Sequence, residues 1–283
     1  MTEIMPLAEA IREFVQDGDA VAMEGFTHLI PHAAGHEVIR QEKQDLILYR
    51  MTPDIIYDQL IGVGAAAKLV FSWGGNPGVG SLHRLREAVE HGWPRPLELV
   101  EHSHAAMAAA YVAGASGLPF GVIRGTPGSD VLAEVATVRW IDSPFSDDRV
   151  LAVAAHRPDV TVIHAQRADR KGNVQLWGIV GIQKEAALAA RRVVVTVEEI
   201  VDELTPVAGQ VVLPHRVVTA VCEVPGGAHP SYAQDYATRD NAFYRDWDAV
   251  SRDRDRFTGW IDRYVRETHG IAEFHDRLAA DAE

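Results

Sequence analysis

Short apolar runs alternate with amphipathic stretches along the first part of the chain. The apolar runs are typical of buried strands, and the stretches after them place apolar residues at helical spacing. Strands are expected at 20–23, 46–49, 68–71 and 97–100. Helices are expected at about 31–39, 53–60, 82–90 and 103–115. This order predicts an α/β fold with an open, mostly parallel sheet covered by helices. Ser81 is the expected N-cap of the third of these helices.

The order is interrupted in the middle of the chain and then returns. Glycine, proline and serine dominate residues 124–145, which predicts either an excursion across the surface or a β-rich insertion. The turn residues at 169–173 predict a hairpin. In residues 241–278 aromatic side chains recur at helical spacing, so a helical tail at 241–283 is expected to pack on the body of a single domain, residues 1–283. Further strands are expected at 151–154, 160–165, 174–177, 192–197 and 216–224, and a helix at 184–190.

Charge and composition indicate which binding partners and which cellular compartment to expect. A net charge of −13 argues against nucleic acid and against an anionic membrane, because both require a basic face. The single cysteine, Cys222, lies in an apolar run, which predicts a buried structural thiol. The chain shows no signal peptide and no apolar run of the roughly eighteen residues that a membrane span needs. We therefore expect a cytoplasmic protein.

Three expected strands are followed by glycine-rich loops, at 24–30, 72–81 and 225–230. The carboxyl ends of parallel strands meet at one edge of a sheet, so three such loops favour a composite site over glycines that only permit turns. In the first loop Gly25 lets the backbone approach a ligand, and the helix after Pro31 offers free N–H groups to an anion. The pattern is not G-x-G-x-x-G, so it does not support dinucleotide binding.

Several polar residues at strand ends are candidates for chemistry. Glu24 follows an apolar strand and is either a catalytic carboxylate with a raised pKa or a hydrogen-bond acceptor in the turn or between subunits. Ser103 and His104 begin a helix, where they suit a carboxylate or carbonyl oxygen, although Ser103 also fits a simple N-cap. Arg84 and Arg86 either attract an anionic substrate or are solvated surface residues.

Three histidines recur at intervals of four residues: His28, His32 and His36. Such spacing can form a metal site, but the H-E-x-x-H pairing is absent and His28 precedes the helix. We therefore expect no metal and interpret them as partly exposed histidines at a helix cap. The sequence also shows no Ser-His-Asp set, zinc-finger spacing or P-loop.

The loops together resemble a known family. Asp17-Gly18-Asp19, an apolar strand and Glu24-Gly25-Phe26-Thr27 are similar to the α-subunit signature of family I coenzyme A transferases, usually D-G-D, a strand and G-G-F. Here Glu24 stands at the first glycine. The resemblance is greatest to A subunits that act on 3-oxoadipate and weaker to those that act on glutaconate. Further matching segments are 24–31, 50–54, 71–80, 162–166, 172–174, 177–178, 197–200 and 225–231.

The resemblance implies a fold shared with sugar-phosphate isomerases and a partner, the B subunit, whose S-E-N-G motif carries the catalytic glutamate. This chain has no S-E-N-G. The implied reaction moves coenzyme A from succinyl-CoA to a 3-oxo dicarboxylate through a glutamyl thioester, so an acyl-CoA is a substrate and no cofactor is permanently bound. This chain would form the opposite wall of the site. The implied wall residues are Gly25, Phe26, Thr27, Asn76, Gly78, Ser103 and His104, with no nucleophile among them.

Two alternatives remain beside the transferase. One branch of the family consists of ring-cleaving hydrolases of CoA thioesters, which use an acid of the A subunit near the segment 101–104. In this chain His104 stands where that acid is expected, which weakens the hydrolase hypothesis. The other alternative is a non-enzymatic ligand-binding domain of a regulator. The acidic charge and the lack of a DNA-binding helix pair argue against it.

Overall fold

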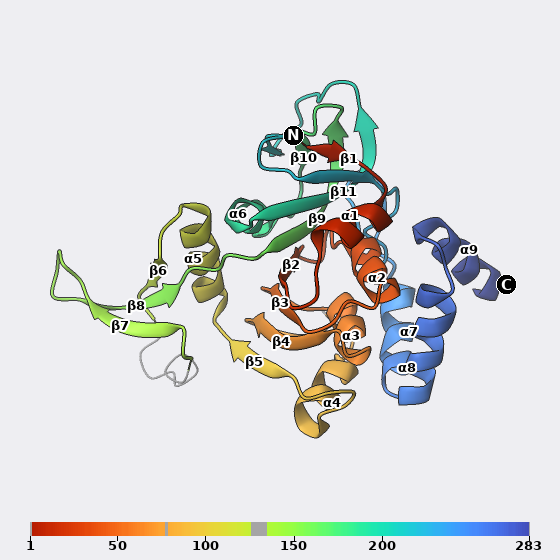
Figure 1. The fold of residues 1–283 in the computed structure, drawn as a ribbon, viewed down its shortest axis with the longest axis horizontal. Helices are drawn as coiled ribbons and strands as arrows, with labels where there is room; N and C mark the ends of the chain where they lie inside the picture. The colour runs from red at the N-terminus through yellow and green to blue at the C-terminus, as the bar shows by residue number, and fades with distance from the viewer. Residues whose placement is uncertain (1, 77–78, 126–134, 283) are drawn as a thin grey trace.

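The computed structural model describes residues 2–76, 79–125 and 135–282 (Figure 1). Its centre is a ten-stranded sheet. Neighbouring strands of its main path are all parallel, as predicted; β10 (Val174–Leu176) and β12 (Val211–Leu213) extend it in antiparallel fashion beside β9. The main path runs β1 (Glu3–Ile4), β13 (Ala220–Glu223), β11 (Arg192–Val201), β9 (Val160–Asp169), β2 (Ala20–Glu24), β3 (Leu46–Arg50), β4 (Ala66–Phe71) and β5 (Glu98–Glu101).

Helices cover both faces of this sheet, which is why its strands are almost continuously apolar. One face packs on α1 (Leu7–Phe14), α2 (His32–Arg40), α3 (Ile55–Gly62) and α4 (His83–His91), and the other on α5 (His104–Ala115) and α6 (Gln183–Ala189). Alternate residues of one strand divide between the two cores. In β2, Val21 and Met23 join the first core, whereas Ala22 joins the second.

The C-terminal part consists of helices α7 (Asn241–Ser251), α8 (Arg254–Ile261) and α9 (Ile271–Ala282), with a π-helical turn η1 (Asp262–Arg266) before α9. Trp247 of α7 and Phe257 of α8 are buried in the same core as α1 to α4. The structure is thus a single α/β domain with C-terminal helices. None of the described helices is long and apolar enough to span a membrane.

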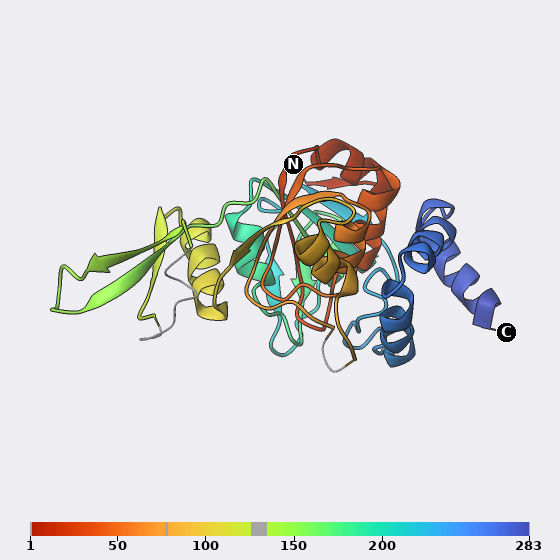
Figure 2. The same ribbon diagram turned by 90° about the horizontal axis from the view of Figure 1, so that it is seen from below.

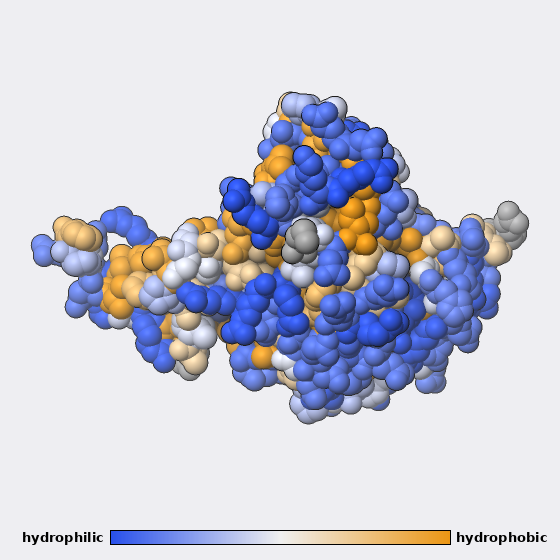
Figure 3. Space-filling model, turned by 45° about the horizontal axis from the view of Figure 1, so that its top comes forward, coloured by the Kyte–Doolittle hydropathy of each residue, from blue (hydrophilic) through white to orange (hydrophobic). Residues whose placement is uncertain are grey.

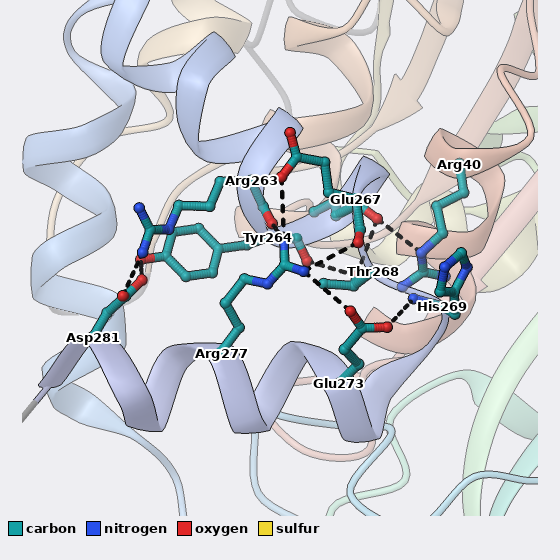
Figure 4. A network of polar contacts seen from close by, with 10 residues as sticks. Arg40, Arg263, Tyr264, Glu267, Thr268, His269, Glu273, Arg277 and Asp281 are labelled. Atoms are coloured by element: carbon teal, nitrogen blue, oxygen red, sulfur yellow. Dashed lines mark hydrogen bonds and ion pairs between the residues drawn. The ribbon is translucent and has the colours of Figure 1, made fainter.

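A polar network fastens α9 to the turn before it (Figure 4). The guanidinium of Arg277 donates to the carbonyl oxygens of Arg263 at 2.5 Å and Glu267 at 3.2 Å, and it pairs with Glu273 at 3.0 Å. At the other end of the helix, Asp281 accepts a hydrogen bond from Arg263. Side-chain bonds to backbone carbonyls thus hold α9 together with the buried ring of Phe274, which packs on Phe243 and Trp260.

A small antiparallel sheet projects from the body (Figures 1 and 2). This arm consists of β6 (Phe120–Ile123), β8 (Arg149–Ala154) and β7 (Val138–Asp142). Its inner face packs on α5, but Phe120 and Val122 on the outer face remain exposed, and apolar side chains gather on the arm in Figure 3. The described residues of 124–145 include β7, which favours the β-rich insertion of the two alternatives expected; residues 126–134 lie outside the described part.

Most other expected elements are present, with two differences. The hairpin at 169–173 is confirmed, and so is the buried thiol of Cys222, whose pKa burial raises to about 12. The expected N-cap role of Ser81 is wrong: Leu82 precedes α4, and the backbone of Ser81 donates instead to Asp248 of α7. The strand expected at 216–224 is shorter, because the chain from 214 to 219 forms turns before β13.

Candidate functional site

The carboxyl ends of β2 to β5 surround a small cavity of about 240 Å³. Side chains from four successive strand ends line it, as in other open α/β sheets. Two come from the loop after β2, one from the last residue of β3 and two from the segment after it, one from the loop after β4, and one from the first residue of α5. They are Phe26, Thr27, Arg50, Thr52, Asp54, Trp73 and His104.

The loop after β2 is tightly folded around Gly25. A Cβ atom at this position would lie 2.8 Å from the carbonyl oxygen of Leu29 and 2.9 Å from that of His28, so no side chain fits. Thr27 has a φ of 57° and Leu29 a φ of 52°. Left-handed backbone is costly for a β-branched residue, by about 1 kcal/mol or more, so the rest of the fold must hold this loop in place.

The residues directly after the third glycine-rich loop provide that support, and neither they nor the loop line the cavity. The backbone N–H of Leu29 donates to the carbonyl oxygen of Tyr232 at 3.0 Å, and that of Ile30 donates to the hydroxyl of Ser231 at 3.1 Å. The ring of His28 lies against Tyr232, with 4.4 Å between centroids. The first two glycine-rich loops therefore contribute to the cavity wall, and the segment after the third loop fixes the first.

A buried cation forms part of the cavity wall. Arg50 is completely buried at the end of β3. Its Nη1 donates to Oδ1 of Asp54 at 2.9 Å, and its Nη2 donates to the carbonyl oxygen of Gly25 at 3.0 Å. Burial raises the pKa of Asp54, and the charge of Arg50 opposes that rise. The guanidinium thus connects the loop after β2 to the segment after β3, and it faces the cavity.

Glu24 lies behind the cavity wall. Its side chain is 2% exposed and is not among the cavity-lining residues. Oε1 accepts hydrogen bonds from the backbone N–H of Met51 at 3.0 Å and from the hydroxyl of Tyr111 at 2.9 Å. Burial raises the pKa of Glu24 to about 7, although the Arg50 charge and these donors lower it. Of the roles considered from sequence, this geometry matches a hydrogen-bond acceptor within the chain.

The remaining sequence candidates are divided between the cavity and its surroundings. Nδ1 of His104 lies 3.2 Å from the hydroxyl of Ser72, beside the cavity. Ser103 caps α5, because its hydroxyl accepts from the N–H of Ala106 at 3.1 Å. The amide of Asn76 donates to the carbonyl oxygen of Tyr244 at 3.1 Å, which directs it toward α7. Gly78 lies outside the described residues.

Neither arginine of α4 lines the cavity. Arg84 is buried and paired with Glu87 at 2.6 Å, and Arg86 is paired with Glu90 on the surface at 3.0 Å. Both interactions lie within one helix, so α4 offers no guanidinium to the cavity.

The three histidines are buried, so the expectation of partly exposed cap residues is wrong. The cause is tertiary packing. Nδ1 of His28 lies 3.0 Å from the carbonyl oxygen of Ile179, and Nε2 of His36 lies 2.9 Å from Oε1 of Gln59. In the described part of the chain no group of three or more histidine, cysteine or acidic side chains is placed to hold a metal ion.

Sequence reasoning had not singled out the cavity residues Arg50, Thr52, Asp54 and Trp73, nor Tyr111 beneath them. A signal was present for the first three, because charged and hydroxyl residues directly follow the apolar run of β3. Tyr111 had little signal, since it lies in an alanine-rich helix and meets Glu24 only in the folded chain.

Three comparisons relate this chain to known proteins. A family model described as Coenzyme A transferase matches residues 4–223. The A subunit of the 3-oxoadipate CoA-transferase of Pseudomonas knackmussii is 62% identical over 279 residues, which cover 99% of each chain. The A subunit of the glutaconate CoA-transferase of Acidaminococcus fermentans is 30% identical over 99% of this chain and 93% of the relative. The crystal structure of glutaconate coenzyme A-transferase from that organism has a TM-score of 0.88 at 29% identity and covers 99% of this chain and 94% of its own.

Proposed function

Because the chain belongs to the coenzyme A transferase family, as an A subunit, we propose that it works with a B subunit to move coenzyme A from succinyl-CoA to a 3-oxo dicarboxylate such as 3-oxoadipate. The observation that carries this proposal is the 62% identity, over 99% of both chains, to a relative named for 3-oxoadipate. The acyl-CoA is a substrate in this scheme.

The cavity suits the acyl part of such substrates. Its volume of about 240 Å³ fits a small acid and not a whole coenzyme A. Hydroxyl groups of Thr27 and Thr52, the imidazole of His104 and the cation of Arg50 offer partners for carboxylate and keto oxygens. The rings of Phe26 and Trp73, which are 41% and 47% exposed, offer apolar surface for the methylene groups between them.

The proposed reaction proceeds by carboxylate exchange on the partner. The B-subunit glutamate attacks the thioester carbonyl of succinyl-CoA, and the coenzyme A thiolate leaves, which forms a mixed anhydride. The thiolate then attacks the glutamyl carbonyl and displaces succinate, which leaves a glutamyl-CoA thioester. The acceptor carboxylate repeats these steps in reverse and restores the free glutamate. Donors of this chain would stabilise the oxygen anion that develops at each carbonyl.

The position of Glu24 supports a nucleophile on the partner. A nucleophile must reach the reacting carbonyl carbon, whereas the carboxylate of Glu24 is buried and bound to Met51 and Tyr111. In the described part of the chain the acid that lines the cavity is Asp54, and Arg50 already holds it at 2.9 Å.

Mass spectrometry of the intact chains tests this proposal. Both chains are co-expressed, exposed to succinyl-CoA without an acceptor, and denatured. We expect a coenzyme A adduct on the B subunit, which 3-oxoadipate then discharges with formation of 3-oxoadipyl-CoA. Glutaconate and 3-oxobutyrate, as a second dicarboxylate and a monocarboxylate, test the acceptor class. An adduct on Glu24, or free coenzyme A without transfer, would contradict the proposal, and the latter would indicate a hydrolase.

A further inference from the structure

Glu24 is a buried carboxylate that the proposed reaction leaves without a role. It terminates β2, and its neighbour Gly25 begins the loop that forms one cavity wall. Its backbone carbonyl is also engaged, because it accepts from the side chain of Gln183 at 3.2 Å. A buried carboxylate is costly unless its environment compensates for lost hydration, so its contacts indicate what it holds together.

Those contacts connect separate walls of the cavity. Met51, whose N–H donates to Glu24, lies between Arg50 and Thr52, and both of these side chains line the cavity. Tyr111 donates to the same oxygen from α5, the helix whose first residue is His104. One carboxylate oxygen thus joins the end of β2, the segment after β3 and the helix after β5.

The charged and titratable groups around Glu24 come from several elements. Arg50 of β3 attracts it, and Asp54 competes with it for that guanidinium. Tyr57 of α3 and Tyr111 of α5 also face it; burial raises the pKa of both hydroxyls, and the charge of Glu24 adds to that rise. The carboxylate form is therefore favoured by the charge of Arg50 and by hydrogen bonds from Tyr111 and from the backbone of Met51 and Gly25, whereas burial opposes it, and the pKa of Glu24 lies at about 7.

We propose that Glu24 is a positioning residue, which holds the backbone at Met51 so that Arg50 and Thr52 face the acceptor acid. The inference rests on the proposed function, because it assigns those two side chains to acceptor binding. A backbone N–H makes a stronger hydrogen bond to an ionised carboxylate than to a neutral carboxyl group. Ionised Glu24 should therefore hold the segment around Met51 better than protonated Glu24. Binding of the acceptor acid should weaken as the pH falls through about 7.

The test measures KM for 3-oxoadipate and kcat between pH 6 and 8 in the complex with the B subunit. Glu24→Ala should raise KM about tenfold at pH 8, with a smaller change in kcat. Glu24→Gln keeps an acceptor oxygen, so it should restore part of that loss. In the wild type KM should rise toward pH 6, and in Glu24→Gln this component of the rise should be absent. His104 is common to both proteins, so its contribution to KM cancels in the comparison.

Asp58→Asn is the matched control. Asp58 is fully buried on α3, burial raises its pKa to about 7, and it accepts hydrogen bonds from Leu85 and Trp247 away from the cavity. This variant should change stability but leave the pH profile of KM as in the wild type. An unchanged KM in Glu24→Ala would overturn the inference. So would a wild-type KM that falls toward pH 6, because Glu24 would then act through its charge on Arg50. Absence of transfer in the wild type would instead refute the proposed function.

Discussion

The hydroxyl of Tyr111 donates to Oε1 of Glu24 across 2.9 Å, so a helix on one face of the sheet is bonded directly to the end of a central strand. Both side chains are almost completely buried. An α5 that shifted along the sheet would break this bond, and the same helix carries His104 at the cavity. The contact therefore couples the packing of α5 to the shape of the site.

Removal of that hydroxyl should be costly. Tyr111→Phe leaves a buried carboxylate with one donor fewer, and we expect the free energy of unfolding to fall by about 1–3 kcal/mol in urea titrations at pH 8. Tyr236→Phe is the control, because its hydroxyl meets the half-exposed Glu199 and should cost at most about 1 kcal/mol. Equal losses in the two variants would contradict the importance of the buried contact.

Gly25→Ala should disrupt the cavity. Its Cβ would lie 2.8 Å from the carbonyl oxygen of Leu29, so the loop carrying Phe26 and Thr27 must move. We expect at least a hundredfold loss of transfer activity, an order of magnitude set by what about 1 Å of misplacement costs. Gly259→Ala in α8 is a matched control, because a Cβ atom added there would have no neighbouring atom within 4 Å. This variant should stabilise the protein by up to about 1 kcal/mol and leave transfer activity unchanged.

His156 should make stability dependent on acid. It is buried against Tyr49 and Tyr111, and burial lowers its pKa to about 3. Below about pH 6.5 the unfolded chain therefore takes up a proton that the folded chain does not. Its contribution to stability should fall by about 1.4 kcal/mol for each pH unit below that value.

His156→Phe should remove the part of the pH dependence of stability that His156 contributes. The measurement is the free energy of unfolding of both proteins from pH 4.5 to 8. Glu24 and Asp58, whose raised pKa values favour the folded state at lower pH, act in the opposite direction but are present in both proteins. The difference between the two proteins should therefore shift in favour of the variant as the pH falls. A difference that stays constant with pH would show that His156 titrates normally.

Arg277→Met should loosen α9 without affecting catalysis. The substitution keeps an apolar stem but removes the donors to the carbonyls of Arg263 and Glu267 (Figure 4). We expect faster amide hydrogen exchange in 271–282 and a loss of about 1 kcal/mol in stability. Arg252→Met, which removes a surface pair with Asp248, should leave exchange in α9 unchanged. Unaltered exchange in both variants would mean that apolar packing alone holds α9.

The sheet could be predicted because its strands are buried on both faces and therefore read as apolar runs. β12 escaped prediction, since Val211–Leu213 is too short to show a period and is defined by its pairing with β10. The site was only partly predictable for a related reason. An arginine at a strand end usually indicates surface, yet Arg50 is buried by Asp54 and by the carbonyl oxygen of Gly25, which lies 25 residues away in the sequence.

Asn76 is a residue that was expected to face the site but is directed elsewhere in the structure. The family resemblance implied that Asn76 belongs to the wall of the site, whereas in the structure its amide donates to the carbonyl oxygen of Tyr244, 168 residues further along the chain. Local pattern identifies which loops meet at the sheet edge. It does not reveal which side chains of those loops turn toward the cavity, because partners distant in sequence decide that direction.

The pairing of Val21 with Val160 has a consequence for how the chain is made. Strand β2 leaves the ribosome long before β9, because about 140 residues separate them, and synthesis at about 5–20 residues per second takes roughly 7–28 s to cover that distance. During this time β2 to β5 can pair with one another, but the other edge of β2 stays open to neighbouring chains. Cooling the producing cells would lengthen that interval, whereas a chaperone that covers the β2 edge would make it harmless.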